Sequence, residues 1–381
     1  MKKLAIISSH PIQYNAPLFA LLAKEPEMEL KVFYTWGKNS IKDKYDPDFQ
    51  QKIQWDIPLL EGYQYQFLDN TSKDPGSHHF YGIINPDLNA EIDKWGADMV
   101  WVWGWSFASH LNAIRYFKGK KEVWFRGDST LLDEPLGFSI KKIFRRFFLK
   151  WVYRHVDKAF YVGTHNKAYF IKHGLQESQL VYAPHAVDSK RFESDDLDYH
   201  TKASLWRSQL GIKPHQKVLL FSGKLEPKKN PLFLLDLINS IHFKEFVVLF
   251  VGAGNMEQEL KERANNQCVF LGFQNQSLMP VIYRMADLYI LPSIGPNETW
   301  GLSINESLAS GTPVFASNRC GGAIDLIQTP KQGLVIDPFQ VAKVREQVLT
   351  WFLQNATKGE RLLIGHNYTD IISAVKQQLK V

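Results

Sequence analysis

Short, unbroken apolar runs alternate with helical stretches along both halves of the chain. The runs lie at residues 4–7, 30–34, 99–103, 122–125 and 159–162, and again at 217–222, 246–251, 268–271, 288–291 and 313–316. Runs without an apolar–polar alternation indicate strands that are covered on both faces. Their alternation with helices predicts an α/β protein built from doubly wound, parallel sheets.

A polar, partly acidic stretch separates the two sets of runs and predicts a linker at 191–204. We therefore expect a Rossmann-like domain at 1–190, a second at 205–360, and a closing segment, 361–381, whose helix crosses back to the first domain. Two such domains place a cleft between the carboxyl ends of their sheets, where these folds bind ligands.

The positive charge of the chain is concentrated in one segment. Lys and Arg total 45 and Asp and Glu total 39, so the net charge is 45 − 39 = +6, and residues 139–158 contain seven basic residues and one Asp. A local excess indicates a local anionic partner and no nucleic-acid surface. One apolar face of this predicted helix comprises Ile140, Ile143, Phe144, Phe147, Trp151 and His155. Two interpretations stay open: a helix on an anionic membrane surface, or a domain helix with a core face and a solvated basic face.

The two cysteines, Cys268 and Cys320, have no CxxC spacing and predict a reducing compartment. No run of about 18 apolar residues occurs, and the N-terminal apolar run is too short for a signal peptide. We expect a cytoplasmic protein that associates peripherally with the inner face of the cell membrane.

Candidate chemistry gathers in "PSIGPNETWGLSINESLASGTPVFAS", residues 292–317. A strand ends at its start, a polar loop follows, and a helix begins near residue 302. Glu298 lies in the loop and Glu306 in the helix. Glu306 suits a ribose diol and Glu298 suits sugar hydroxyls, while amides at the helix start form an anion site. Those amides belong to Gly301, Leu302 and Ser303.

The stretch "ETWGLSINESLASGTPV" resembles the motif of retaining glycosyltransferases of family 4, in which two glutamates eight positions apart precede a small residue, Pro and Val. "FSGKLEPKKNP" (221–231) is similar to the basic donor segment of that family and "VFLGF" (269–273) follows in order. The resemblance implies the two-domain GT-B fold and a nucleotide diphosphate sugar as donor. It implies that Lys224, Lys229 and Glu298 act in catalysis and that Phe273 lines the donor site. Lys224 stands where Arg is usual, which keeps the charge without the bidentate fork.

The resemblance also implies transfer to a hydroxyl of a glycan or lipid-linked glycan, of the kind found in cell-surface polysaccharides. Since lysines and helix amides can carry the leaving-group charge, we expect no metal and no cofactor. Two alternatives stay open: a GT-B sugar-nucleotide epimerase, which needs no acceptor, and a non-catalytic homologue that binds nucleotide sugars or membranes.

The first half offers four candidates for the acceptor or the cleft. The turn after the first strand, "SHPIQYNAP", has no glycine, so His10 and Gln13 would supply side chains where the family uses backbone. The alternative is that His10 caps the turn. Arg126 and Asp128 follow another strand end, and the alternative for them is an Arg–Asp pair that fixes a loop.

Overall fold

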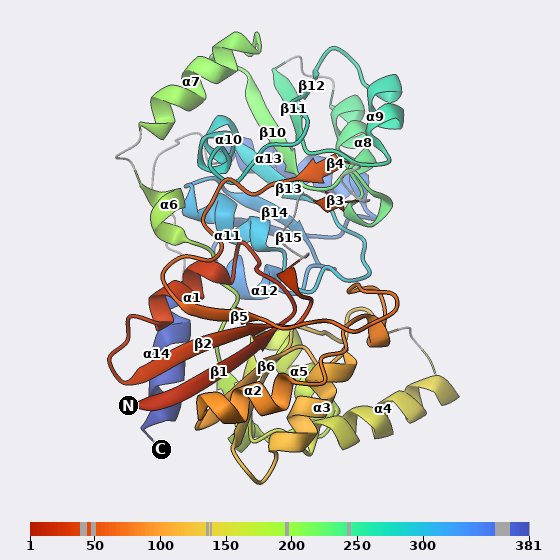
Figure 1. Cartoon of the computed structure of the whole chain (residues 1–381). Coiled ribbons are helices and arrows are strands. Elements are labelled where there is room, and N and C mark those ends of the chain that lie inside the picture. Colours follow the sequence, from red (N-terminus) through yellow and green to blue (C-terminus); the bar gives the residue numbers. More distant parts are fainter. Residues whose placement is uncertain are drawn as a thin grey trace. The chain divides into compact units, whose positions relative to one another are not determined.

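The computed structural model describes residues 1–38, 44–46, 51–134, 137, 139–194, 198–241, 245–354 and 366–380. The chain divides into two compact units (Figure 1). Unit 1 comprises 1–44, 57–185 and 368–381, and unit 2 comprises 45–56 and 186–367. Each unit is therefore assembled from separate parts of the chain, with residues 45–56 joining the C-terminal part in unit 2.

Unit 1 contains a seven-stranded sheet. Its strands are β1 (Lys2–Ser8), β2 (Met28–Tyr34), β5 (Gln64–Phe67), β6 (Met99–Trp103), β7 (Glu122–Arg126), β8 (Lys158–Tyr161) and β9 (Leu180–Tyr182). They lie in the order β5-β2-β1-β6-β7-β8-β9, and neighbouring strands are parallel. The sequence pattern predicts five of these strands and misses β5 and β9, which are short and only partly apolar.

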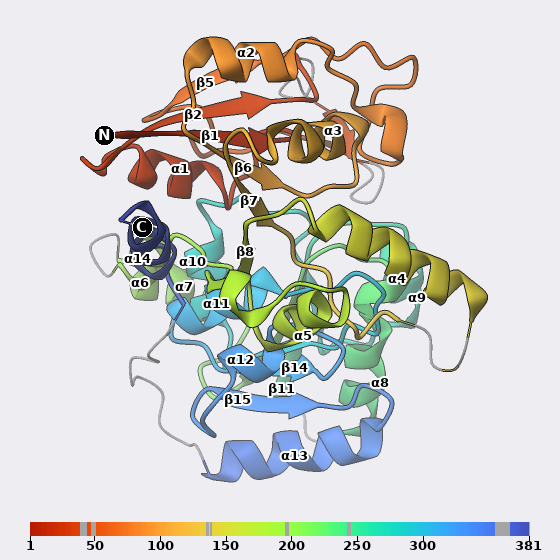
Figure 2. The same cartoon turned by 90° about the horizontal axis from the view of Figure 1, so that it is seen from below.

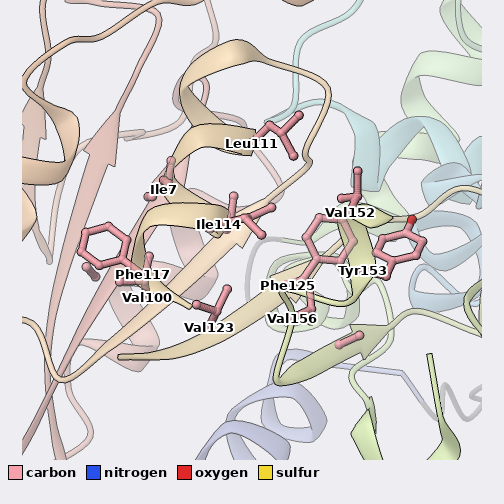
Figure 3. Close-up of a cluster of buried hydrophobic side chains, with 14 of the residues drawn as sticks. Ile7, Val100, Leu111, Ile114, Phe117, Val123, Phe125, Val152, Tyr153 and Val156 are labelled. Atoms are coloured by element: carbon pink, nitrogen blue, oxygen red, sulfur yellow. The ribbon is translucent and has the colours of Figure 1, made fainter. Parts of the chain in front are cut away.

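Among its described residues, unit 1 has the α-helices α1 (Ala16–Leu22), α2 (Leu88–Trp95), α3 (Ala108–Phe117), α4 (Ile140–Tyr153), α5 (Thr164–Lys172) and α14 (Tyr368–Leu379). Figure 3 shows how α3 and the end of α4 reach the sheet. Ile114 and Phe117 of α3 and Val152 of α4 pack with Val123 and Phe125 of β7 in one buried cluster. This cluster fixes α3 and the C-terminal end of α4 on the sheet.

Unit 2 contains a six-stranded sheet. Its strands are β10 (Lys217–Ser222), β11 (Phe246–Val251), β12 (Cys268–Phe270), β13 (Leu288–Leu291), β14 (Val314–Ser317) and β15 (Gly333–Ile336). They lie in the order β12-β11-β10-β13-β14-β15 and are parallel. All six residues of β11 are buried, which explains why its sequence, FVVLFV, shows no alternation.

The remaining elements of unit 2 are α6 (Ser189–Glu193), α7 (Tyr199–Gln209), α8 (Leu232–Ser240), α9 (Glu257–Arg263), α10 (Met279–Met285), α11 (Leu302–Ala309), α12 (Ala323–Leu326) and α13 (Val341–Gln354). A small two-stranded sheet pairs β3 (Lys44–Asp46) with β4 (Gln51–Ile53). The stretch expected as a linker, 191–204, contains the end of α6 and the start of α7, with 195–197 outside the described residues. Buried Phe192, Tyr199 and Ala203 tie both helices to this unit, so helix packing replaces the linker.

The expected closing segment, 361–381, contains α14, and its residues 361–365 lie outside the described ones. Helix α14 contacts α1 in unit 1. The Tyr368 hydroxyl donates a hydrogen bond of 2.9 Å to the Tyr14 carbonyl, and Lys376 forms ion pairs with Glu25 and Glu27. No helix among the described residues is both long and apolar enough to cross a membrane.

Both sheets reverse their strand order beside the first strand of the unit. The reversal falls between β1 and β6 in unit 1 and between β10 and β13 in unit 2. Loops that leave the carboxyl ends of two such strands diverge to opposite sides, so a crevice opens between them in open parallel sheets. The loops after these four strands are therefore where each unit can hold a ligand.

Candidate functional site

Lys229 and Glu298 meet at the switch point of unit 2. Lys229 ends the single turn of 3-10 helix (Pro227–Lys229) that follows β10, and Glu298 lies in the loop after β13. The Lys229 ammonium forms an ion pair with Oε2 of Glu298. Backbone contacts hold the two loops together, because the Ile294 amide donates to the Lys228 carbonyl at 2.9 Å. Two predicted catalytic residues thus come together where the fold leaves a ligand crevice.

The environment of the pair holds both side chains in place and favours the charged form of Lys229. The Ser293 hydroxyl donates to Glu298 Oε2 at 2.9 Å, and the Gly321 amide donates to the Glu298 carbonyl at 3.0 Å. Burial alone would lower the pKa of Lys229, but the charge and hydrogen bond of Glu298 outweigh it and raise that pKa above its ordinary value. Lys229 is therefore a fixed cation, suited to an anionic group that enters this crevice.

Gly301 starts helix α11 in a conformation that favours glycine. Its φ is +88°, and a Cβ there would lie 3.1 Å from both Ile304 Cδ1 and Leu291 Cδ2. The first amides of α11, which include those of the predicted residues Leu302 and Ser303, lie at the positive end of the helix dipole. This end of α11 can therefore accept a negative charge, and the binding of the donor by Gly301, Leu302 and Ser303 stays a prediction.

Glu306 lies one turn into α11 and is buried. The hydroxyl of Tyr283, on α10, donates a hydrogen bond of 2.8 Å to Glu306 Oε2. Tyr283 therefore fixes the carboxylate that the sequence assigns to a ribose diol. Its role toward a ribose stays a prediction. Tyr283 is a candidate site residue that the sequence did not reveal. It stands in an apolar helical stretch, "VIYRMADL", where nothing distinguishes it from a core tyrosine.

Lys224 lies on the loop between β10 and Lys229. The residue before it binds the end of β11, and the residue after it binds the loop that follows β11. The Gly223 amide donates to the Val251 carbonyl and the Leu225 amide to the Ala253 carbonyl, each at 2.9 Å. A Cβ on Gly252 would lie 1.8 Å from the Gly223 carbonyl oxygen. The close approach of the two backbones therefore requires a glycine, and it fixes the backbone on both sides of Lys224.

Phe273 follows β12 and contacts a part of the chain that sequence analysis did not connect with it. Its ring centroid lies 6.3 Å from that of Trp55. The Asn275 side chain donates to the Gln54 carbonyl at 2.6 Å, and the Asp56 carboxylate accepts hydrogen bonds from Ser277. Residues 54–56 thus form an arm on the loop beside Phe273. No local pattern in the sequence reveals a contact over more than 200 residues.

His10 and Gln13 lie in the turn between β1 and α1, at the switch point of unit 1, and both are half-buried. The His10 Nδ1 lies 3.0 Å from Ser9 Oγ, and its ring meets the Trp36 ring edge-on at 5.1 Å. The Trp36 amide donates to the Ser9 carbonyl at 2.8 Å. These contacts orient the His10 ring, and its role toward donor or acceptor stays a prediction.

Arg126 is buried at the end of β7 and binds backbone. Its Nη1 and Nη2 donate to the carbonyls of Ala183 and Pro184 at 2.8 and 3.1 Å, and its guanidinium lies over the Trp103 ring. Burial lowers the Arg126 pKa to about 10. This geometry favours the fixing of a loop over contact with a ligand. Asp128 Oδ2 lies 3.7 Å from Nε2 of His185, and the charge of Asp128 also favours the charged form of Arg126 by raising its pKa.

His110 is a buried polar residue near the same switch point that the sequence analysis did not assign. Its Nδ1 lies 2.9 Å from the Gly104 carbonyl, and its Nε2 lies 2.8 Å from Thr35 Oγ1. A carbonyl only accepts, so Nδ1 carries the proton and Nε2 accepts from the threonine. Burial lowers the His110 pKa to about 4. His110 is thus a neutral link between the strand-end loops after β2 and β6.

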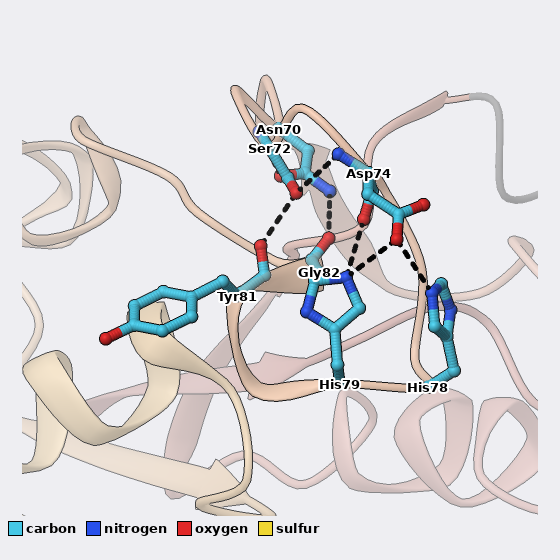
Figure 4. A network of polar contacts seen from close by, with 7 residues as sticks. All are labelled: Asn70, Ser72, Asp74, His78, His79, Tyr81 and Gly82. Carbon is cyan, nitrogen blue, oxygen red and sulfur yellow. Dashed lines mark hydrogen bonds and ion pairs between the residues drawn. The ribbon is translucent and has the colours of Figure 1, made fainter.

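One group of described residues has the composition of a cation site. The ligand atoms of Asp74, His78 and His79 lie within 4.8 Å of one another. Figure 4 shows the two imidazoles directed at the Asp74 carboxylate, with Nε2–Oδ2 distances of 3.1 and 3.2 Å. All three are accessible to solvent, and their mutual hydrogen bonds account for the arrangement. The sequence expectation of no metal and no cofactor stays a prediction.

Comparisons with known proteins bear on unit 2 first. Residues 203–363 match the family model described as glycosyl transferases group 1. The chain is 29% identical over 149 residues to an uncharacterized glycosyltransferase of Methanocaldococcus jannaschii, over 38% of this chain and 37% of that protein. It is 34% identical over 140 residues to alpha-monoglucosyldiacylglycerol synthase of Streptococcus pneumoniae, over 35% of this chain and 31% of that protein. The matched segments span about a third of these curated relatives.

A solved structure is similar over the whole chain. The structure of HepE from Anabaena in complex with UDP has a TM-score of 0.69, with 16% sequence identity, and covers 100% of both chains. At this identity the likeness shows a shared fold, with two Rossmann-like units of parallel strands and helices.

Proposed function

We propose that this protein transfers a sugar from a nucleotide diphosphate sugar. The premise is that residues 203–363 match the group 1 glycosyltransferase family in a chain with the GT-B fold. The acceptor is a hydroxyl of a glycan or lipid-linked glycan, and the sugar keeps its anomeric configuration. The observation that carries the proposal is the Lys229–Glu298 pair at the switch point of unit 2, next to the start of α11.

The chemistry of the leaving group supports this assignment. Breaking the bond between the sugar carbon and the phosphate oxygen develops negative charge on the diphosphate. Lys229 and the amides at the start of α11 can stabilise that charge, with Lys224 from the preceding loop. In the retaining mechanism the acceptor oxygen bonds to the sugar carbon on the face that the diphosphate leaves, and a phosphate oxygen takes the acceptor proton. No metal is assigned a part in this proposal.

The relatives support the substrate classes. The HepE structure is a complex with UDP, and the pneumococcal relative is named a glucosyldiacylglycerol synthase. A nucleoside diphosphate as part of the donor and a lipid-linked acceptor are therefore the first classes to test. Glu306, which Tyr283 holds by a hydrogen bond, is proposed to bind the ribose of the donor. Phe273 is proposed to line the part of the donor site that takes the base.

Calorimetry with UDP, GDP, dTDP, ADP and CMP tests the donor site. We expect one diphosphate to bind at micromolar level and Lys229→Ala and Glu306→Ala each to weaken it at least tenfold, or about 1.4 kcal/mol. Lys228→Ala is the matched control, because Lys228 is adjacent but pairs with Glu226. Equal binding by the protein and the two site variants would refute the assignment.

Turnover distinguishes the alternatives. Release of the nucleotide that requires an acceptor supports transfer. Conversion of the sugar nucleotide without an acceptor would instead indicate the epimerase, and binding without turnover would indicate a non-catalytic homologue. An assay with a chelator tests metal independence, for which we expect unchanged turnover.

A further inference from the structure

Helix α4 exposes large apolar side chains on one side. The exposed fractions of Ile140, Phe144 and Phe147 are 65%, 71% and 69%. Ile143 and Phe148 are also exposed. A single exposed apolar residue needs no explanation, but five within nine residues of one helix form a continuous patch. We call Ile140, Ile143, Phe144, Phe147 and Phe148 the apolar stripe.

The side of α4 opposite the apolar stripe holds the helix on unit 1. Leu149, Val152 and Tyr153 are buried, and Figure 3 shows Val152 and Tyr153 in the buried cluster. Successive helix residues are about 100° apart, so Leu149, two positions after Phe147, points away from it. The stripe is thus exposed on an anchored helix. Of the two interpretations left open, a core face on Ile140, Phe144 and Phe147 does not hold, because Leu149, Val152 and Tyr153 bury the opposite side.

The N-terminal part of α4 extends beyond the rest of unit 1. In Figures 1 and 2 the start of the helix lies beyond α3 and α5, while its end returns to β8. The first half of the helix therefore projects from unit 1, and Ile140 and Phe144 are exposed on it. Nearer the C-terminal end of the helix, the Phe148 ring packs edge-on against the Trp105 ring, with the two centroids 5.5 Å apart.

The basic side chains of α4 indicate which kind of partner the apolar stripe fits. The helix has five basic residues and no acidic residue, in the sequence IKKIFRRFFLKWVY. By helical geometry Lys141 lies on one flank of the apolar stripe and Arg146 and Lys150 on the other. An apolar stripe between cations matches a bilayer with anionic head groups, which accepts rings at the acyl boundary and cations at the phosphates. A symmetric pairing of two α4 helices would instead set cations against cations.

We propose that α4 docks this protein on an anionic lipid bilayer, with the apolar stripe at the boundary between head groups and acyl chains. This adds a partner to the proposed function and does not depend on it, because lipid binding is measured without turnover. The docked helix would hold unit 1, the expected acceptor-binding half, at the surface where a lipid-linked acceptor resides.

Co-sedimentation with vesicles tests the proposal. We expect the protein to bind vesicles of phosphatidylcholine mixed with phosphatidylglycerol and to bind pure phosphatidylcholine vesicles far less. Phe144→Ser with Phe147→Ser should weaken binding at least tenfold, and so should Lys141→Glu with Arg146→Glu. The matched control is Phe339→Ser, because Phe339 is 70% exposed in unit 2 and should not affect lipid binding.

Folding and self-association are measured on the same samples. All variants should keep the circular dichroism spectrum, the melting temperature and the nucleotide affinity of the unaltered protein, because the substituted side chains are exposed. The proposal is overturned if the unaltered protein ignores anionic vesicles, or if the Phe144/Phe147 variant binds them as well as the unaltered protein does. It is also overturned if the protein is a dimer that these serines dissociate while vesicle binding is absent.

Discussion

Lys229 and Glu298 are 69 positions apart in the chain, yet their side chains form an ion pair across the loops that follow β10 and β13. Both side chains are mostly buried, so removal of either leaves a poorly solvated charge. The pair therefore links the stability of unit 2 to its proposed donor site.

Lys229→Met should lower the free energy of unfolding by about 3 kcal/mol, because it leaves the Glu298 carboxylate unpaired in a mostly buried place. The folded state raises the Lys229 pKa, so the stability that this lysine contributes is present below its ordinary pKa of 10.5. It is lost as pH rises through the higher folded value. Denaturant titrations from neutral to strongly alkaline pH should therefore give unfolding free energies for the unaltered protein and Lys229→Met that approach each other only at the alkaline end. Convergence already near neutral pH would contradict the pairing.

Tyr283→Phe removes the hydroxyl that binds Glu306 and keeps the ring. We expect a loss of about 1–3 kcal/mol in unfolding free energy, because a buried carboxylate oxygen loses a donor. Nucleotide affinity should fall as well, since Glu306 is no longer held in place. Denaturation and calorimetry measure the two effects, and Tyr81→Phe, on an exposed tyrosine, is the control that should change neither.

Arg126→Met should destabilise the protein by about 2–4 kcal/mol and leave nucleotide affinity intact. The substitution leaves the carbonyls of Ala183 and Pro184 without their donors. Arg126→Lys should recover little stability, because an ammonium lacks the two-pronged geometry. If either variant lost nucleotide binding while remaining folded, Arg126 would be a ligand contact after all.

The burial of His110 should make the folded protein less stable at acidic pH. Burial lowers its pKa to about 4, whereas an unfolded histidine titrates near 6.5. Below about pH 6.5 the unfolded state gains a proton that the folded state does not, so stability falls by up to about 3 kcal/mol as pH drops toward 4. His110→Asn should show a smaller loss over this interval in thermal melts. Parallel pH profiles for both proteins would contradict the assignment.

Gly252→Ala should weaken nucleotide binding by moving the loop that carries Lys224. Its Cβ would lie 1.8 Å from the Gly223 carbonyl oxygen, which is backbone and has to shift. Gly211→Ala is the matched control, because Gly211 also has positive φ but no atom lies within 4 Å of its Cβ position. We expect both variants to lose about 1 kcal/mol from the positive φ. Gly252→Ala should lose more stability than Gly211→Ala, because the Gly223 backbone has to shift, and it alone should lose affinity.

The central strands were predictable because burial on both faces leaves an unbroken apolar run, as in β11. The edge strands β5 and β9, QYQF and LVY, are short and partly exposed, so they carry no such run. The loop from Glu298 to Gly301 was predictable because its chemistry is local in sequence. The contacts of Tyr283 and His110 depend on packing between distant elements, and the sequence does not report which polar groups that packing brings together.

The orientation of α4 was unpredictable for a related reason. Its apolar residues surround much of the helix, so periodicity identifies two apolar sides without telling which side meets the sheet. In the structure, the buried side of α4 consists of Leu149, Val152 and Tyr153. They lie near the C-terminal end of the helix, where it joins the buried cluster with Val123 and Phe125.

The arm at residues 54–56 and helix α14 have a consequence for synthesis of the chain. Unit 2 takes residues 45–56 from the N-terminal part, and unit 1 takes 368–381 from the C-terminal part. Domains commonly fold one after the other as they leave the ribosome. Unit 1 therefore lacks helix α14 until all of unit 2 has been synthesised, and a gene cut before residue 186 encodes neither unit whole.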